Sequence, residues 1–246
     1  MRTSEPTLGR RALVTGASGG IGEAIAERLA RDGAHVVVHA NTRLEAAEAI
    51  AARIVAQGGS AEAIAFDVTD RAAALAACER LLAAGAIQIV VNNAGIHDDA
   101  AFPALREAQW KGVIDVSLNG FFNVTQPLVM PMIRTRWGRI VNLSSVAAIA
   151  GNRGQVNYAA AKGALNSATK ALALELASRG ITVNAVAPGL IAAGMAAQID
   201  PALVEKLVPM KRAGSAAEVA ALVAFLASDE AGYISGQVVS INGAMI

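Results

Sequence analysis

The stretch "RALVTGASGGIG" (11–22) decides the fold. Its first part, "RALVT" (11–15), is a short apolar run typical of a buried strand, and glycines then lead into a helix-forming stretch. Glycines at such a turn let the backbone approach a ligand, and the start of the helix favours an anion such as a pyrophosphate. An ordinary glycine-rich turn is the alternative. The candidate nucleotide-binding residues of this turn are Gly16, Ser18, Gly20, Ile21 and Gly22.

The same alternation of apolar runs and alanine-rich helical stretches continues along the whole chain. Nearly continuous apolar strands are typical of a parallel sheet that helices cover on both faces. We therefore predict an α/β fold of the Rossmann type in one domain (1–246), with a doubly wound, seven-stranded parallel sheet. Ligands of such folds bind beyond the carboxyl ends of the strands. The expected strands are 11–15, 35–39, 61–66, 87–92, 139–144, 181–187 and 237–241.

Composition excludes several classes of protein. The 246 residues are 54% hydrophobic and 17% charged, which predicts a globular chain, and the net charge of +1 does not favour nucleic-acid binding. The N-terminal "MRTSEPTLGRR" lacks the apolar core of a signal peptide, and no apolar run is long enough to span a membrane. The single cysteine, Cys78, fits a reducing compartment, so we expect a cytoplasmic protein. Three scattered histidines and one cysteine predict no metal site.

The end of the second strand indicates which dinucleotide would bind. Sites for NAD usually carry an acidic residue there, but "VVVHANTR" (36–43) has none before Glu45. Asn41, Thr42 and Arg43 can instead hydrogen-bond and neutralise a 2′-phosphate, which favours NADP. Arg43 can equally be a solvated residue at the start of a helix.

A further nucleotide contact is expected after the third strand, at Asp67 and Val68. The carboxylate of Asp67 can accept a hydrogen bond from the adenine amino group. It can also be the N-cap of the next helix, and the sequence does not separate the two.

Several motifs resemble one family. "TGASGGIG", "NNAG" (92–95), the set Ser145, Tyr158 and Lys162, and "PG" (188–189) are similar, in order and spacing, to the short-chain dehydrogenase/reductases. "GNRGQVNYAAAKGAL" (151–165), "ELASRGITVNAVAPGLI" (175–191) and "ISGQVVSINGAM" (234–245) resemble its β-ketoacyl-acyl carrier protein reductases. "AAFPALREAQW" and "VTQPLVMPMI" resemble the branch of those reductases found in aryl-polyene pathways.

The resemblance implies NADPH-dependent reduction of a 3-oxoacyl thioester to the 3-hydroxyacyl thioester in fatty acid or polyene biosynthesis. It assigns Ser145 to hold the carbonyl, Tyr158 to deliver the proton, and Lys162 to bind the ribose. Tyr158 and Lys162 are four residues apart and share one helical face, so the ammonium should lower the pKa of the phenol. An exposed helical pair is the alternative. The resemblance adds Asn93, Ala94, Gly95, Pro188, Gly189 and Ile191 as contacts for NADP(H).

Asn119 in "SLNGFF" matches the fourth catalytic position of the family, which holds a water in a proton relay. A polar residue that kinks a helix is the alternative, because asparagine is a poor helix former. Asn92 and Asn93 are expected to shape the turn after the fourth strand and to support the neighbouring strand.

The chain departs from the family pattern at three positions. Gly19 stands where a basic residue often contacts the 2′-phosphate. Ala193 stands where many relatives carry a threonine for the nicotinamide carboxamide, so that group would rely on the backbone of Ile191. Ala244 replaces a usual glycine. The segment around 189–212, rich in glycine and alanine at its start, is expected to form a lid over the substrate.

Acyl carrier protein is acidic and needs basic residues at the rim of the site. Arg136 and Arg179 match docking positions of the family, although both can be cations that interact with helix C-termini. The helices around 105–135 and 157–178 are apolar on more than one face. In the family that the chain resembles, these two helices form one interface and the C-terminal strand forms a second, so the resemblance implies a homotetramer. Pro127 and Pro131 should kink or end the first helix. Two rival functions remain: a dehydrogenase for an acyl-CoA, sugar or other small alcohol or ketone, and a non-catalytic nucleotide sensor.

Overall fold

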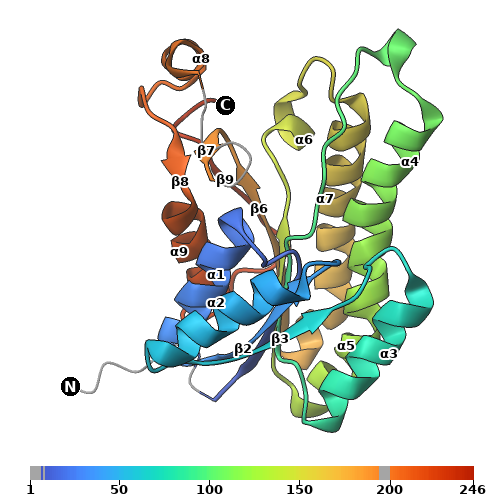
Figure 1. Cartoon of the computed structure of the whole chain (residues 1–246), viewed down its shortest axis with the longest axis vertical. Coiled ribbons are helices and arrows are strands. Elements are labelled where there is room, and N and C mark those ends of the chain that lie inside the picture. The colour runs from blue at the N-terminus through green and yellow to red at the C-terminus, as the bar shows by residue number, and fades with distance from the viewer. Residues whose placement is uncertain (1–6, 8, 194–199) are drawn as a thin grey trace.

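The computed structural model describes residues 7, 9–193 and 200–246. Seven strands form one parallel sheet in the order β3-β2-β1-β4-β5-β6-β9, as the sequence predicts (Figure 1). The predicted strand ends lie within two residues of the observed ones. The strands are β1 Arg11–Val14, β2 His35–Ala40, β3 Ser60–Ala65, β4 Ile89–Asn92, β5 Gly138–Leu143, β6 Ile181–Pro188 and β9 Val238–Ile241, and a separate pair joins β7 Ile191–Ala192 to β8 Gly214–Ser215.

Helices cover both faces of the sheet (Figure 1). One hydrophobic core lies under α1, α2 and α9, and a second lies under α3, α5 and α7. The central strands β4, β5 and β6 are buried throughout, which explains their continuous apolar sequences. The helices are α1 Gly20–Arg31, α2 Leu44–Ala56, α3 Arg71–Ala83, α4 Glu107–Ile114, α5 Gly120–Thr135, α6 Ala147–Ala150, α7 Val156–Leu176, α8 Pro201–Leu207 and α9 Ala216–Leu226.

The helix expected around 105–135 is interrupted. A 3₁₀ turn (Phe102–Ala104) precedes α4, and a π-helical turn (Asp115–Asn119) joins α4 to α5. Pro127 and Pro131 are expected from the sequence to kink or end a helix. They do not end it, because α5 continues through both to Thr135, and a kink stays a prediction. π-Helical turns often mark functional sites, and this one packs against α7.

A chain of buried polar side chains fixes the central strands to the helices behind them. Asn92 Nδ2 donates to Thr125 Oγ1 on α5 and to Asn142 Oδ1 on β5, each at 2.9 Å. Asn142 Nδ2 then donates to Thr169 Oγ1 on α7 at 2.8 Å. The expectation that Asn92 supports the neighbouring strand is thus confirmed. The network holds the ends of β4 and β5 at a fixed height relative to α7, where the catalytic candidates lie.

No helix in the described part of the chain is both long enough and apolar enough to cross a membrane.

Candidate active site

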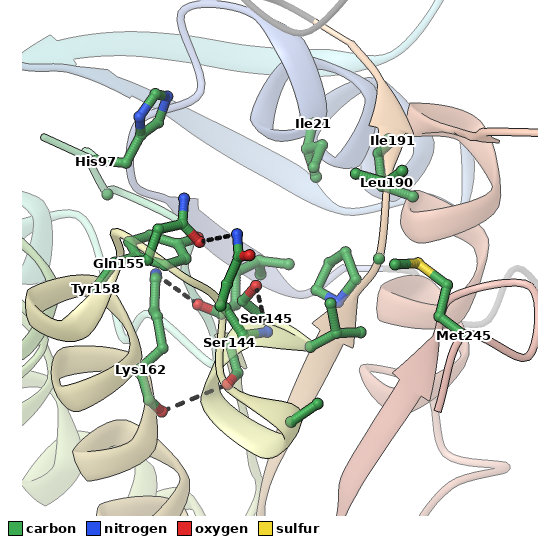
Figure 2. Close-up of a pocket in the computed structure, with 18 of the residues that line it drawn as sticks. Ile21, His97, Ser144, Ser145, Gln155, Tyr158, Lys162, Leu190, Ile191 and Met245 are labelled. Carbon is green, nitrogen blue, oxygen red and sulfur yellow. Dashed lines mark hydrogen bonds between the residues drawn. The ribbon is translucent and has the colours of Figure 1, made fainter. Parts of the chain in front are cut away.

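Ser145, Tyr158 and Lys162 meet in one cavity of about 670 Å³. Ser145 follows the end of β5, while Tyr158 and Lys162 lie one turn apart near the start of α7 and face that strand end (Figure 2). Leu190, Ile191 and Met245 form the opposite wall. The volume lies within the range of small-molecule sites. The exposed-pair alternative for Tyr158 and Lys162 is wrong, because Lys162 is only 3% exposed.

The ammonium group of Lys162 is held in place by the backbone. Its Nζ donates to the main-chain carbonyl of Leu143 at 2.7 Å. Burial lowers the pKa of this lysine to about 8. Gly95 lies on the other side, where a Cβ atom would stand 3.1 Å from Lys162 Nζ. The charge therefore sits between two strand ends, and the exposed backbone of Gly95 lies beside it.

The phenol of Tyr158 does not show the expected pKa decrease. Burial raises its pKa, the hydroxyl of Ser145 lowers it, and the negative charge of Asp99 raises it again. Lys162 Nζ lies 5.7 Å from the centroid of the Tyr158 ring and is engaged with Leu143. In this structure, therefore, desolvation outweighs the interaction with Ser145, and the pKa of the phenol lies above its usual value.

The two adjacent serines differ in their contacts. Ser144 is buried, and its hydroxyl donates to the main-chain carbonyl of Lys162 at 3.4 Å. Ser145 Oγ accepts a hydrogen bond from the amide of Ala147 at 3.2 Å and interacts with the phenol of Tyr158. The hydroxyl of Ser145 can therefore still donate to a ligand in the cavity.

The side chain of Asn93 fixes the conformation of the glycine-rich turn through hydrogen bonds. Its Nδ2 donates to the carbonyls of Thr15 and Gly16, both at 2.9 Å. A Cβ atom on Gly22 would lie 2.5 Å from that same nitrogen, and Gly16 adopts a φ of 61°, so both positions require glycine. The first amides of α1 have no partners inside the helix and are free for an anion. Ser18, Gly20, Ile21 and Ala94 belong to the same turn and the adjacent strand end.

The expected adenosine contacts lie beside this turn, outside the cavity. Asn41, Thr42 and Arg43 are exposed after β2, and Arg43 is the N-cap residue of α2. Asp67 is not a helix cap, because Asp70 caps α3 and Asp67 Oδ1 accepts from the amide of Thr69 at 2.8 Å. Val68 is buried and would meet a Cβ atom on Gly120 at 2.9 Å.

Asn119 does not face the cavity. Its side chain is exposed and donates to Asp115 Oδ1 at 2.7 Å. The side chain of Asn119 therefore does not line the cavity in this structure, and the relay role expected of this residue stays a prediction. Ser117, two residues earlier in the same π-helical turn, is 3% exposed, and its hydroxyl has no hydrogen-bond partner among the described residues. No feature of the sequence singles out Ser117, because serine is common in helices and the π-helical turn was not predicted.

The expected lid is only partly described. Ile191 pairs with Gly214, and Leu203 and Leu207 of α8 line the cavity together with Pro188, Gly189 and Ala193. Residues 194–199 of the segment lie outside the described residues. Ala244 adopts a φ of 66°, a left-handed conformation that explains the glycine usual in the family.

The two expected docking arginines lie at the end of the sheet opposite to the cavity of their own chain. Arg136 and Arg179 precede β5 and β6, whereas Ser145 follows β5. The six residues of β5 span about 20 Å between these ends. Arg136 Nη2 donates to the carbonyl of Ser178, beyond the end of α7, at 3.1 Å, so the alternative of a cation at a helix C-terminus is confirmed for it. Neither arginine lines the cavity of its own chain.

A parallel doubly wound sheet with a serine, tyrosine and lysine at its carboxyl edge is the arrangement of the short chain dehydrogenases. The model of the short chain dehydrogenase family matches residues 10–203, and the chain belongs to this family. The chain is 48% identical over 238 residues to a 3-oxoacyl-[acyl-carrier-protein] reductase FabG of Aggregatibacter actinomycetemcomitans, with 95% of this chain and 98% of the relative aligned. It is 44% identical over 241 residues to the protein of the same name from Pseudomonas aeruginosa, with 96% and 97% aligned.

Among solved structures, a putative gluconate dehydrogenase from Agrobacterium tumefaciens superposes with a TM-score of 0.94 at 34% identity, covering 98% of each chain. The predicted fold and family are confirmed. The similarity to the aryl-polyene branch stays a prediction.

Proposed function

We propose that the chain is an NADPH-dependent reductase that converts a 3-oxoacyl thioester, carried by acyl carrier protein, into the 3-hydroxyacyl thioester. The observation that carries the proposal is the convergence of Ser145, Tyr158 and Lys162 on one cavity with apolar walls. The names of the relatives that are 44–48% identical support the substrate class. A cytoplasmic location, suited to such a pathway, is part of the same proposal.

The residues present fit a nicotinamide dinucleotide. The free amides at the start of α1 suit the pyrophosphate, and the open backbone of Gly95 beside Lys162 suits a ribose. Asn93, Pro188, Gly189 and Ile191 line the cavity where the nicotinamide half would lie. When bound, the reduced cofactor supplies the hydride that the ketone carbon receives. Asn41, Thr42 and Arg43, with no acidic residue between the end of β2 and Glu45, favour the 2′-phosphate of NADP.

Proton transfer follows from the side chains. The hydroxyl of Ser145 donates a hydrogen bond to the substrate carbonyl oxygen and fixes its position. Tyr158 holds its proton because burial raises the pKa of the phenol, and it passes that proton to the oxygen as negative charge develops there. The ammonium of Lys162 then stabilises the phenolate that remains.

Docking of a carrier protein through Arg136 and Arg179 would require a second copy of the chain, because both arginines lie at the end of the sheet opposite to the cavity of their own chain. Phe122 and Met130 on α5 and Leu174 on α7 are more than half exposed, an apolar surface suited to association. Two copies that pack these helices antiparallel would bring Arg136 and Arg179 of each toward the cavity of the other. This arrangement is consistent with the homotetramer that we propose.

The rival substrate class is a small polar alcohol or ketone, favoured by the superposition on a putative gluconate dehydrogenase. Leu190, Leu203 and Leu207 form an apolar part of the cavity wall that suits an acyl chain and offers no partner for sugar hydroxyls. His97, Asn152 and Gln155 line the same cavity and are the side chains that a polar substrate would use. A non-catalytic nucleotide sensor has no need of a proton donor, whereas Tyr158 and Ser145 both line the cavity.

The test is oxidation of NADPH and NADH with an acetoacetyl thioester, for wild type, Tyr158→Phe and Tyr233→Phe. Tyr233, the other tyrosine of the chain, is fully exposed and serves as the matched control. We expect NADPH-preferring turnover that falls at least about 100-fold in Tyr158→Phe alone. Wild type that binds nucleotide but reduces no thioester would contradict the proposal. Arg136→Glu with Arg179→Glu should impair only the carrier-bound substrate.

A further inference from the structure

His39, at the end of β2, uses both of its ring nitrogens. The side chain is buried, with 1% exposed. The amide of Gly16 donates to Nδ1 at 3.0 Å, and Nε2 bonds the carbonyl of Phe66 at 2.8 Å. Because a peptide N–H only donates and a carbonyl only accepts, the ring must carry its proton on Nε2.

The surroundings keep this ring neutral. Burial lowers the pKa of His39 to about 4, although the bond to Phe66 and the charge of Asp67 act in the opposite direction. The ring of Phe66 packs on it, with centroids 4.2 Å apart. At neutral pH, Nδ1 therefore keeps its lone pair for Gly16.

The bonded amide belongs to the first glycine of the nucleotide turn. Asn93 holds the carbonyl of Gly16 from β4, and the main-chain carbonyl of His39 accepts from the amide of Ala17 at 2.8 Å. Gly16 itself is tightly enclosed, because a Cβ atom there would lie 2.9 Å from Ala94 Cα. The turn is thus held from two sides by hydrogen bonds. The ring and the main-chain carbonyl of His39 hold it on one side, and the side chain of Asn93 holds it on the other.

The same ring reaches the adenosine side of the site. Phe66 directly precedes Asp67 and Val68, the candidate adenine contacts at the end of β3. One neutral imidazole therefore connects the turn after β1 to the segment after β3. Both segments flank the place where the adenosine diphosphate half of a dinucleotide would lie.

We propose that His39 is a positioning residue for the dinucleotide: it holds the glycine turn and the Phe66–Val68 segment in the conformation that receives the adenosine diphosphate moiety. This inference rests on the proposed dinucleotide function. A site held in its bound conformation binds more tightly because less conformational entropy is lost on binding. His39 lies away from Tyr158 and Lys162, so it affects nucleotide affinity and leaves the chemical step unchanged.

Three substitutions of His39 test its hydrogen bonds to Gly16 and to Phe66 separately. In His39→Asn, the amide oxygen can replace Nδ1 as acceptor for Gly16. In His39→Gln, the amide nitrogen can replace Nε2 as donor to Phe66, and the acceptor for Gly16 is lost. His39→Phe keeps an aromatic ring and loses both bonds. His35→Phe is the matched control, because His35 begins the same strand and contacts Ser60 instead of the turn.

Affinity for NADP⁺ and ADP-ribose is measured by titration calorimetry, and kcat at saturating NADPH is measured separately. We expect Kd to rise roughly 10-fold for His39→Gln and His39→Phe, to stay within about threefold for His39→Asn, and to be unchanged for His35→Phe. The kcat values should all match wild type. Hydrogen exchange of the peptide spanning 12–20 should be faster in His39→Gln than in His39→Asn.

The outcomes are distinguishable. If wild type binds neither ligand, the dinucleotide function fails, and the role of His39 falls with it. If wild type binds both and His39→Gln binds them equally well, only the role of His39 is refuted. If His39→Phe does not fold, the comparison of His39→Asn with His39→Gln decides, and equal losses in these two would overturn the link through Gly16.

Discussion

The backbone of Gly95 lies against the ammonium group of Lys162, so that a Cβ atom on Gly95 would stand 3.1 Å from Lys162 Nζ. This spacing is tighter than an ordinary contact. The ammonium cannot retreat without weakening its 2.7 Å bond to Leu143. The two residues therefore define together how closely a ribose can approach the charge.

Replacing Gly95 by alanine should lower activity. The added methyl group displaces the ammonium and covers the approach to it, so we expect kcat/KM to fall by about 10- to 100-fold, with a weaker affinity for NADPH. Steady-state kinetics and titration with NADPH measure both effects. Gly19→Ala is the matched control, because nothing lies within 4 Å of a Cβ atom there. Equal activity of the two variants would show that Gly95 is not an approach to Lys162.

A basic residue at position 19 should strengthen the preference for NADPH. Gly19 precedes α1, has an extended backbone with φ of 160°, and leaves open space for a side chain. Gly19→Arg adds a guanidinium beside the expected site of the 2′-phosphate. We expect the KM ratio of NADH to NADPH to rise about threefold to 10-fold, and the gain to shrink at high salt. A variant that improves NADH equally would place the 2′-phosphate elsewhere.

The parts of the site that depend on strand ends could be predicted from the sequence. Ser145, Gly95 and the glycine turn each follow an apolar run, and parallel strands bring such residues to one edge. The same logic could have shown that Arg136 and Arg179 do not reach the cavity of their own chain, because both precede strands and must lie at the opposite edge. The pKa of Tyr158 could not be predicted, since a motif gives the spacing of two groups but not how deeply they are buried. The π-helical turn that turns Asn119 outward has no local signal either.

Asn119→Ala tests the assignment of that residue. Its side chain makes one exposed hydrogen bond, to Asp115, so we expect kcat to change less than about threefold and stability by less than about 1 kcal/mol. Kinetics with the acetoacetyl thioester and urea denaturation measure these effects. A loss of 100-fold or more, on the order expected for a general acid–base residue, would restore Asn119 to the catalytic set. Asp115→Ala, which removes the same bond from the other side, is the control.

Lys162 should reduce the stability of the chain at neutral pH. Its pKa is about 8 in the folded chain, below the ordinary value of 10.5, so the folded state binds this proton less tightly than the unfolded state does. The loss of folding stability caused by this buried charge is therefore complete below about pH 8 and disappears as the pH rises through 8 toward 10.5. The pKa shift corresponds to a loss of about 3 kcal/mol in the free energy of unfolding. A variant without the ammonium regains this amount but loses the hydrogen bond to Leu143, which is worth about 1 kcal/mol.

Lys162→Met should accordingly abolish turnover and yet raise the free energy of unfolding by about 2 kcal/mol near neutral pH. The gain should shrink near pH 10, where wild type also folds with a largely neutral lysine. Urea denaturation at both pH values measures it, and Lys170→Met, an exposed lysine on the same helix, should show no such dependence. If Lys162→Met were destabilised equally at both pH values, folding would not lower the pKa of Lys162, and the buried charge would not reduce stability. A stabilised but inactive variant would show instead that the fold tolerates a buried charge because the chemistry requires it.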